Sequence, residues 1–445
     1  MSTVTSARVA ADFKAICGPQ YVIEDPADLQ AWSILGVLPA IAVRPASADE
    51  VAAVLRSANE LGLSVVSAGG FTHQEIGNLP PQVDIVLSTS RLVEVEHYDP
   101  GDLTIGIGAG CTATHLSAIV AENGLLFAAD PAQAERCTLG GLLATNMSGP
   151  LRHGYGGLRD YCLGVRFVTG DGRKAKGGGR VVKNVAGYDL MKLMIGSQGT
   201  LGVITSASFK LFPAPRQTRT FTATFPTAAE AIAFRDRALR SPLAFICLEI
   251  ISPQASTMLG PSGLADNQSW LVVLRAAGSD AVLNRCRAEI GADVSREIEG
   301  RHEADFWRAL DNFSLIAAER HPSSLLISMN LPLSGVLPVL SEVANVADSN
   351  RVCFAAIGRV GVGHLLLSLW QSPEEELSMV SFINTVSALR SRLPRDASMA
   401  VLRCPLETRH HLSAWGPMPT HMESMRAVKM ALDPKDILNR GRFLF

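Results

Sequence analysis

The sequence lacks the signatures of several large protein classes. Its formal net charge is −2 over 445 residues, which gives no basic surface for nucleic acid or anionic membranes. No apolar run reaches the about 18–20 residues of a transmembrane helix. The first residues, MSTVTSARVAADFKAICG, carry no basic segment followed by a continuous apolar core, so we expect no secretory signal.

Cysteine is present but is not grouped. The eight cysteines are scattered without any CxxC pair, which argues against a zinc site or an iron–sulfur cluster and favours reduced thiols in a cytosolic protein. The motifs HxH, HExxH and HGDGN are absent, and so are GxSxG, a P-loop and a GxGxxG after a strand. We therefore predict no metal site, and hydrolase, nucleotide-triphosphatase and nicotinamide-enzyme functions have no support.

What the sequence does contain is an ordinary globular composition, with 47% hydrophobic and 18% charged residues. This length predicts two or three domains. The pattern over 41–89 predicts a β-α-β unit, in which Ser47 and Glu50 form a capping box and Gly62 ends the helix. The helix residues expected to be buried are Val51, Val54, Leu55, Ala58 and Leu61.

Alternating patterns follow. Apolar residues on either side of the turn at 99–102 predict a hairpin, Thr112 is expected to cap a helix, and Asp171-Gly172 predicts a second hairpin. A long alternating strand over 201–211 is stopped by Pro213 and Pro215, where we place a domain boundary.

Residues 219–400 alternate between strand and helix patterns. Expected helices include 228–240, 302–315, 335–347 and 374–392. Such alternation with antiparallel returns predicts an α+β arrangement of a sheet against helices.

A glycine-rich stretch, residues 178–205 (GGRVVKNVAGYDLMKLMIGSQGTLGVIT), is the most informative part of the chain. Glycine occurs where φ is positive or where no Cβ is tolerated, so the cluster indicates a backbone lying against a ligand. A second stretch, over 130–160, has paired glycines and small polar residues in the order P…TLGG…ATN..GP….YG..RD. Small residues there allow close approach to a flat ring system.

Together these stretches resemble the flavin-binding domain of the FAD oxidoreductases related to vanillyl-alcohol oxidase and D-lactate dehydrogenase. Within that superfamily the chain is most similar to the E subunits of bacterial glycolate oxidases. The resemblance implies an α+β fold, with a two-subdomain FAD-binding domain of PCMH type and an α+β, ferredoxin-like cap domain. We expect the FAD-binding domain at 1–215, the cap at 216–400 and a segment returning to the flavin domain at 401–445.

The resemblance also implies which residues bind FAD. The loop 68–74 would hold the pyrophosphate, the stretch after Pro131 would lie along the flavin ring and ribityl chain, and 202–205 would pair with the adenine. The expected cofactor-binding residues are Ala68, Gly69, Gly70, Phe71, Thr72, His73, Pro131, Thr138, Gly140, Gly141, Thr145, Asn146, Gly149, Lys183, Asn184, Val203 and Ile204.

Three positions depart from the family pattern. Phe71 stands where a third glycine is expected, so its side chain could crowd the phosphates or shift the loop. His73 is one residue beyond the histidine that some relatives link covalently to flavin, and an ordinary hydrogen bond is the favoured role. In the C-terminal motif ending Leu438-Asn439-Arg440-Gly441-Arg442, Arg440 replaces a proline.

The second half offers only weak catalytic candidates, Arg359 and His364, and His364 is expected to begin a strand. The resemblance implies an FAD-binding, electron-transferring subunit of a complex that oxidises glycolate to glyoxylate. Its partners would be a catalytic sister flavin subunit and an iron–sulfur subunit. The complex would lie in the cytoplasm or at the inner membrane through those partners. Two alternatives remain open: a stand-alone FAD-dependent 2-hydroxy-acid dehydrogenase, and a scaffold subunit that has lost its flavin.

Overall fold

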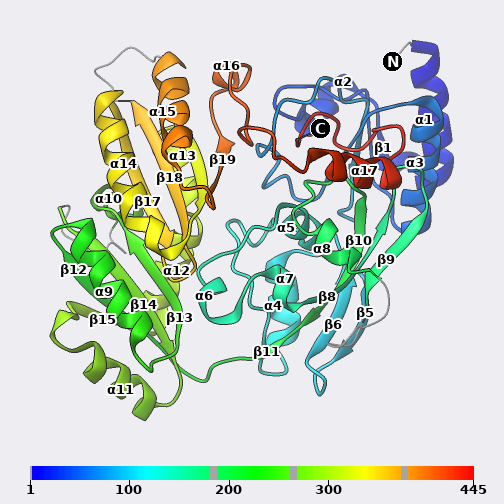
Figure 1. Ribbon diagram of the computed structural model, residues 1–445. Helices are drawn as coiled ribbons and strands as arrows, with labels where there is room; N and C mark the ends of the chain where they lie inside the picture. Colours follow the sequence, from blue (N-terminus) through cyan, green and yellow to red (C-terminus); the bar gives the residue numbers. More distant parts are fainter. Residues whose placement is uncertain (1–2, 180–187, 261–267, 372–378, 445) are drawn as a thin grey trace. The chain divides into compact units, whose positions relative to one another are not determined.

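The chain divides into two compact units, drawn in Figure 1. The computed structural model describes residues 3–179, 188–260, 268–371 and 379–444. Unit 1 comprises Met1–Ser148, Gly157–Ala214 and Pro417–Phe445, and unit 2 comprises Gly149–Gly156 and Pro215–Gly416. The returning segment of unit 1 thus begins at Pro417, later than the expected 401.

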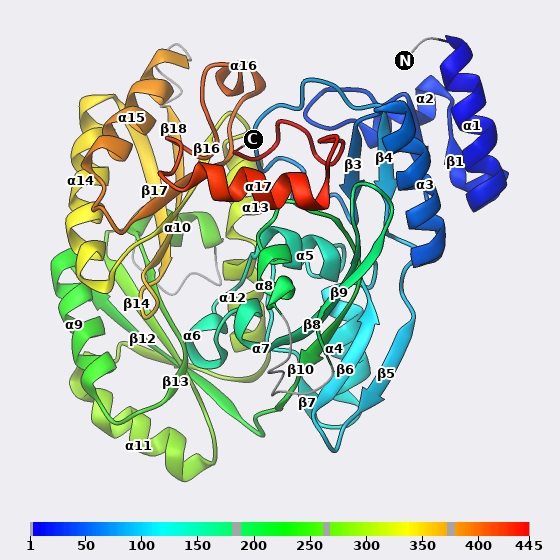
Figure 2. The same cartoon turned by 45° about the vertical axis from the view of Figure 1, so that its right-hand side comes forward.

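Unit 1 contains a four-stranded sheet in the order β1-β2-β4-β3, in which β2, β4 and β3 run parallel. Its strands are β1 (Val22–Ile23), β2 (Ile41–Val43), β3 (Val65–Ala68) and β4 (Ile85–Ser88). The helices of this part are α1 (Thr3–Cys17), α2 (Pro26–Leu29) and α3 (Ala48–Leu61). Helix α1 lies beside α3 (Figure 2), and both contribute to one apolar core.

Helix α3 forms where the sequence predicts it, but only half of the capping box is made, because the Glu50 carboxylate accepts from the Ala46 amide at 2.8 Å and not from the Ser47 amide. Ser47 Oγ accepts a hydrogen bond from the Glu50 amide at 3.2 Å, and Gly62 ends the helix with φ +67°. The prediction that Leu61 is buried is wrong, because its side chain is 44% exposed. The chain reverses at Gly62, and Leu63 enters the core instead.

A second sheet of unit 1 has the order β5-β6-β10-β8-β9. Its strands are β5 (Val95–Asp99), β6 (Thr104–Gly108), β8 (Cys162–Val168), β9 (Lys174–Gly178) and β10 (Val203–Lys210), beside a separate pair of β7 (Leu125–Leu126) and β11 (Phe212–Pro213). The associated helices are α4 (Ala113–Ala121), α5 (Leu139–Thr145), α7 (Leu158–Tyr161) and α8 (Leu190–Met194). Both predicted hairpins are confirmed, since β5 pairs antiparallel with β6 and β8 with β9.

Unit 2 is an antiparallel eight-stranded sheet in the order β15-β12-β14-β13-β17-β18-β16-β19. The strands are β12 (Thr218–Phe225), β13 (Phe245–Ile251), β14 (Trp270–Ala277), β15 (Arg296–Ile298), β16 (Leu325–Asn330), β17 (Val352–Arg359), β18 (His364–Gln371) and β19 (Ser398–Arg403). The helices are α6 (Arg152–Tyr155), α9 (Ala228–Arg240), α10 (Pro253–Leu259), α11 (Asp280–Ile290), α12 (Gly300–Asp311), α13 (Phe313–Arg320), α14 (Val336–Ser349), α15 (Met379–Arg392) and α16 (Leu406–Arg409). Helices α9, α14 and α15 cover one face and share its apolar core, so the α+β prediction is confirmed (Figure 2).

One predicted helix of unit 2 is in fact two. The pattern over 302–315 is interrupted at Asn312, between α12 and α13. The Asn312 side chain donates a hydrogen bond to the Arg308 carbonyl at 2.9 Å. The Asn312 amide donates to the same carbonyl at 3.2 Å, but the residue has φ −88° and ψ +13°, so its backbone leaves the helical conformation and α12 ends there.

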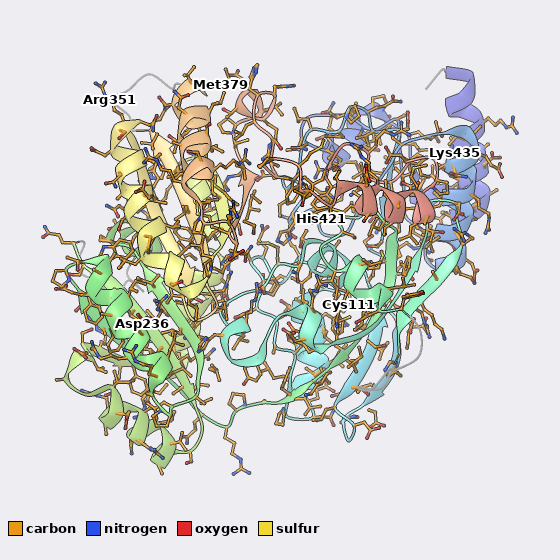
Figure 3. All side chains as sticks on the ribbon, viewed as in Figure 1. Cys111, Asp236, Arg351, Met379, His421 and Lys435 are labelled. Atoms are coloured by element: carbon orange, nitrogen blue, oxygen red, sulfur yellow. The ribbon has the colours of Figure 1, made fainter. Side chains whose placement is uncertain are left out.

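The C-terminal segment completes unit 1. Helix α17 (Met422–Leu432) follows His421, labelled in Figure 3, and the chain beyond it runs along β3 through a bridge between Leu438 and Val65. No helix in the described ranges is long and apolar enough to cross a membrane.

Candidate functional site

A cavity lies in unit 1 at the end of β3. It is formed by the loop after β3, the start of α5, the turn before β10 and the C-terminal segment. The residues that line it are Ser67, Ala68, Gly69, Gly70, Phe71, Thr72, His73, Gln74, Ile76, Thr89, Thr138, Gly140, Gly141, Ala144, Thr145, Gln198, Gly199, Gly202, Val203, Ile204, Asn439 and Arg442.

The loop after β3 owes its shape to two glycines. A Cβ at Gly69 would collide with Thr138 Oγ1, and a Cβ at Gly70 would collide with the carbonyl of Arg136. Only glycine permits this approach between the loop and the segment before α5. Successive backbone amides of such a loop can bind an anion.

Phe71 has a left-handed backbone conformation, which favours glycine, with φ +58°. Its ring packs edge-on against Trp32, with centroids 5.5 Å apart and planes at 83°. This aromatic contact adds to the small apolar cluster that contains Val66 and Val86. The side chain is therefore anchored by packing, although the residue lines the cavity.

His73 lies in the same loop and is held in its neutral form. Burial lowers its pKa to about 4. Its Nδ1 lies 2.8 Å from Thr72 Oγ1, in hydrogen-bond contact. A neutral imidazole at pH 7 contributes a hydrogen-bonding group to the cavity and no positive charge.

The opposite wall offers an unsatisfied polar atom. Thr138 Oγ1 is buried and has no hydrogen-bond partner among the described residues, whereas nearly all such atoms in proteins are paired. Gly140 and Gly141 follow it along the wall. An orphaned hydroxyl beside a backbone cradle fits a ligand that carries hydrogen-bonding groups and an extended phosphate-bearing chain, as FAD does.

The cavity brings together many of the residues expected to bind a cofactor. These are Ala68, Gly69, Gly70, Phe71, Thr72, His73, Thr138, Gly140, Gly141, Thr145, Val203 and Ile204. Pro131, Asn146 and Gly149 are not among the lining residues; Asn146 ends α5, and Gly149 belongs to unit 2. Lys183 and Asn184 lie outside the described residues.

Sequence reasoning did not assign several lining residues to the site. They are Ser67, Ile76, Thr89, Ala144, Gln198, Gly199, Asn439 and Arg442. The signal for some of them was present, because Gln198–Gly202 and Asn439–Arg442 belong to motifs that the sequence analysis singled out. Asn439 and Ser67 are 372 positions apart in the chain yet are hydrogen-bonded, so only folding shows that they share a site.

The weak catalytic candidates form a pair in unit 2. Arg359 ends β17 and His364 begins β18, which confirms the predicted strand start, and the two are directly opposite each other. Arg359 Nη1 lies 3.0 Å from His364 Nδ1. A guanidinium only donates hydrogen bonds, so Nδ1 is the acceptor and carries no proton.

The second nitrogen of His364 is also engaged. Nε2 lies 3.0 Å from Ser328 Oγ, and in the neutral ring it carries the proton and donates it. Burial lowers the pKa of His364 well below its ordinary value, and the charges of Arg359 and Arg152 lower it further. His364 thus orients Arg359 and is poorly suited to accept a proton from a substrate.

A buried carboxylate faces the same guanidinium. Glu249 on β13 is 1% exposed, and its Oε1 lies 4.0 Å from Arg359 Nε. That distance gives charge attraction without a hydrogen bond, and Nε has no hydrogen-bond partner among the described residues. The Arg359 side chain is 11% exposed, so its charge is strongly shielded from water. Within the described ranges, no three His, Cys, Asp or Glu side chains form a group that could hold a metal ion.

Two family models match this chain. The model described as FAD binding domain matches residues 39–176, and the model described as FAD linked oxidases, C-terminal domain, matches residues 214–392 and 417–443. The chain belongs to the FAD-linked oxidases with a PCMH-type FAD-binding domain. Its cofactor is FAD, and the cavity described above fits that group.

Relatives of this FAD-linked oxidase include proteins of several activities. D-lactate dehydrogenase of Archaeoglobus fulgidus is 39% identical over 43% of each chain. Glycolate oxidase subunit GlcD of Bacillus subtilis is 24% identical over 91% of this chain and 89% of that one. Glycolate oxidase subunit GlcE of Escherichia coli is 33% identical over 48% of this chain and 55% of that one.

Solved structures share the fold. The crystal structure of p-cresol methylhydroxylase with substrate bound matches 99% of this chain and 97% of that one, with a TM-score of 0.77 and 15% identity. At that identity the likeness establishes the fold alone. The predicted PCMH-type FAD-binding domain followed by a second α+β domain is thereby confirmed.

Proposed function

We propose that this FAD-linked oxidase acts on a small 2-hydroxy acid. Relatives named as D-lactate dehydrogenases, as glycolate oxidase subunits and as D-2-hydroxyglutarate dehydrogenase support this substrate class. Oxidation of a 2-hydroxy acid to a 2-oxo acid removes two electrons and two protons from the carbon and its hydroxyl. FAD supplies the two-electron acceptor for that chemistry.

Residues of the unit 1 cavity would hold the cofactor. The amides of 69–73 would bind the pyrophosphate, the segment from Thr138 to Thr145 would contact the flavin and ribityl chain, and Val203 and Ile204 would lie at the adenine. The glycines of the loop and the unpaired Thr138 hydroxyl support this assignment.

The single observation that carries the substrate assignment is the shielded guanidinium of Arg359. A 2-hydroxy acid has one constant charge, its carboxylate, and arginine binds carboxylates through hydrogen bonds that are stronger when water is excluded. Arg359 Nε is free of a hydrogen-bond partner among the described residues. His364 holds the far side of the guanidinium through Nη1 and so positions it.

Substitution of Arg359 tests this assignment. In the assembly as purified, with a dye acceptor and glycolate, D-lactate or D-2-hydroxyglutarate as substrate, we expect Arg359→Met to raise KM at least about tenfold, which corresponds to about 1.4 kcal/mol. Arg359→Lys keeps the charge but loses the planar guanidinium that can donate two parallel hydrogen bonds. Its KM should lie between those of the wild type and of Arg359→Met. The control is Arg301→Met, whose wild-type side chain is 92% exposed. An unchanged KM for all three acids in Arg359→Met would refute the role.

A finer assignment concerns the assembly. We infer as a second candidate function that the chain is an electron-transferring FAD subunit of a glycolate oxidase-like complex, with a catalytic sister flavin subunit and an iron–sulfur subunit as partners. In that case the sister subunit binds the substrate, and Arg359 does not. The specific observation in its favour is that both ring nitrogens of His364 are engaged, so the candidate base is already occupied. Similarity to both GlcD and GlcE supports such a complex.

Co-purification separates this role from a stand-alone dehydrogenase. When the chain is tagged in its native cells and purified, two further subunits should co-purify with it, one that carries flavin and one with the absorbance of an iron–sulfur cluster. The isolated chain should bind FAD but reduce the dye at least about a hundredfold more slowly than the assembly, a difference of about 2.7 kcal/mol in activation free energy. Full dye-linked turnover by the isolated chain would establish the stand-alone enzyme instead.

A further inference from the structure

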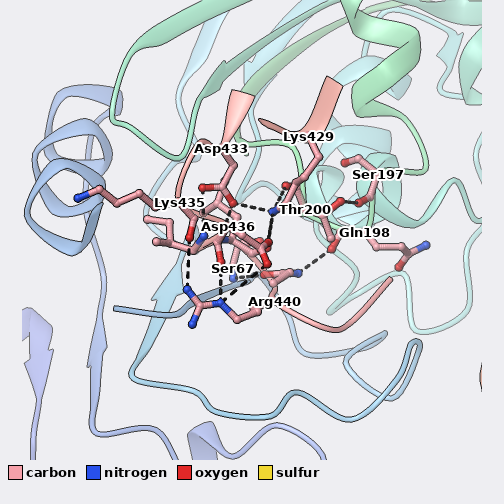
Figure 4. Close-up of polar contacts among 12 residues, drawn as sticks. Ser67, Ser197, Gln198, Thr200, Lys429, Asp433, Lys435, Asp436 and Arg440 are labelled. Atoms are coloured by element: carbon pink, nitrogen blue, oxygen red, sulfur yellow. Dashed lines mark hydrogen bonds and ion pairs between the residues drawn. The ribbon is translucent and has the colours of Figure 1, made fainter. Parts of the chain in front are cut away.

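The C-terminal segment 429–442 is bonded to the chain segments that line the FAD cavity. Figure 4 shows its polar contacts with the turn at 197–200 and with Ser67 at the end of β3. The backbone joins β3 as well, because the Val65 amide donates to Ile437 O and the Asn439 amide donates to Val65 O, both at 2.8 Å. The segment thus forms part of the framework around the cavity.

Lys429 is the buried centre of these contacts. Its residue is 3% exposed, and Nζ lies 2.6 Å from Asp433 Oδ2 and 2.9 Å from Asp436 Oδ1. The same ammonium donates to Thr200 O at 2.9 Å and to Leu438 O at 3.1 Å. A buried ammonium is costly without such partners, so this set of contacts is favourable only when the turn and the segment are together.

Asp433 fixes the direction in which the segment continues. Its carboxylate is fully buried and accepts hydrogen bonds from the amides of Ile437 at 3.1 Å and Leu438 at 2.8 Å. One carboxylate therefore neutralises Lys429 and closes the turn that leads to Asn439.

Asn439 joins two walls of the cavity. Its Oδ1 accepts a hydrogen bond from the Ser67 amide at 3.0 Å, and its Nδ2 donates to Gln198 O at 2.6 Å. Ser67, Gln198 and Asn439 all line the cavity. The side-chain amide of Asn439 therefore links Ser67 to Gln198.

Arg442 joins the loop after β3 in the same way. Its Nη2 donates to Gln74 O at 2.6 Å and to Ile76 O at 2.7 Å, and its own carbonyl accepts from the Asn78 amide at 3.0 Å. Gln74 and Ile76 also line the cavity. Lys429, Asn439 and Arg442 together hold the loop after β3 and the turn at 197–200.

We propose that segment 429–442 is a clamp whose docking creates the binding-competent FAD cavity, so that FAD binding and clamp docking are thermodynamically coupled. If FAD binds only the docked form, bound FAD stabilises docking, and the apparent FAD affinity falls in proportion to the docked fraction of the flavin-free protein. Lys429, Asn439 and Arg442 are positioning residues in this proposal. The inference depends on FAD binding and is independent of the substrate.

The test measures FAD affinity and clamp protection separately. Full-length protein stripped of flavin is titrated with FAD and followed by flavin fluorescence, and limited proteolysis with mass spectrometry follows cleavage within 417–445. We expect Lys429→Met to weaken FAD binding at least about tenfold. We also expect FAD to slow cleavage of this region at least about tenfold in the wild type, and much less in the variant.

A second variant decides the question if Lys429→Met does not fold. Asn439→Asp keeps the acceptor for the Ser67 amide, but it replaces the donor to Gln198 O with a carboxylate oxygen that repels this carbonyl. The link to the turn at 197–200 is lost, so FAD affinity should fall. The control is Glu303→Gln in unit 2, where Glu303 Oε1 accepts from Thr220 at 2.6 Å and from Arg275 at 3.1 Å. The control should lose stability yet bind FAD as the wild type does.

The outcomes that would overturn the clamp are specific. One is an FAD affinity of Asn439→Asp within about threefold of the wild type, a difference of about 0.7 kcal/mol. The other is a cleavage rate of the wild-type segment that is the same with and without FAD. Neither result bears on the substrate, so each leaves the Arg359 assignment to its own test.

Discussion

The proposed FAD cavity of unit 1 and the Arg359 cluster of unit 2 are built in opposite ways. The cavity is shaped by glycines, backbone amides and short polar side chains that lie close together in a few loops. The Arg359 cluster is made of charged and polar side chains from separate strands, β13, β16, β17 and β18. The cavity depends on the backbone conformations and close approaches that glycine permits. The cluster depends on which side chains meet across the sheet.

The comparison predicts that the largest effects come from added bulk in unit 1. Gly70→Ala places a Cβ against the Arg136 carbonyl, a backbone atom that cannot move away cheaply. We expect FAD affinity to fall more than about a hundredfold, or about 2.7 kcal/mol, measured by titration of flavin-free protein. The matched control is Gly179→Ala, where nothing lies within 4 Å of the new Cβ. Equal FAD affinity in the two variants would show that the loop accommodates a Cβ at position 70.

In unit 2 we expect the next largest effect from removal of the Glu249 carboxylate beside Arg359. Glu249→Leu leaves Arg359 buried without its carboxylate, and losing one partner of a buried pair costs roughly 3 kcal/mol. We expect that loss in the chemical unfolding of unit 2, with FAD affinity unchanged. The double variant Glu249→Leu/Arg359→Met should recover part of the stability. No recovery would mean that the pair is not coupled.

Acid should weaken both units through their neutral histidines. The folded-state pKa of His73 is about 4 and that of His364 is lowered well below 6.5. Between pH 6.5 and those lower values only the unfolded state is protonated, so stability is full above pH 6.5 and falls as the pH drops. The loss is about 1.4 kcal/mol per pH unit for each histidine.

Unfolding at pH 7.5, 6 and 5 measures this dependence. His73→Asn and His364→Asn should each reduce the slope of unfolding free energy against pH by the contribution of one histidine. A curve as steep as that of the wild type in either variant would contradict the assignment for that residue. The double variant should be the least dependent on pH.

The smallest effect is expected at Phe71. Phe71→Gly removes a left-handed strain of about 1 kcal/mol but also removes the ring that packs on Trp32. Because that packing already anchors the side chain, FAD affinity should change less than about threefold, or 0.7 kcal/mol. A large gain in affinity would show that the ring obstructs the cofactor.

Sequence reasoning predicted the cavity far better than the cluster. Gly69, Gly70, Thr138 and Gly141 stand in short motifs, and a motif of consecutive residues keeps its geometry wherever its loop is placed. Arg359 and His364 were also found, because a tight turn joins their strands. Glu249 and Ser328 were missed, since they reach the same cluster from strands more than thirty residues away in the chain.

The sequence by itself determined the flavin-binding fold and the glycine loop after β3, because glycine spacing and hydrophobic alternation act over a few residues. Tertiary structure alone decided that Phe71 packs on Trp32, that His364 has no free nitrogen and that Lys429 sits among two carboxylates and two carbonyls. Those facts depend on contacts between segments far apart in the chain. Burial then sets their energies, since charges and hydrogen bonds removed from water depend on every neighbour that the fold supplies.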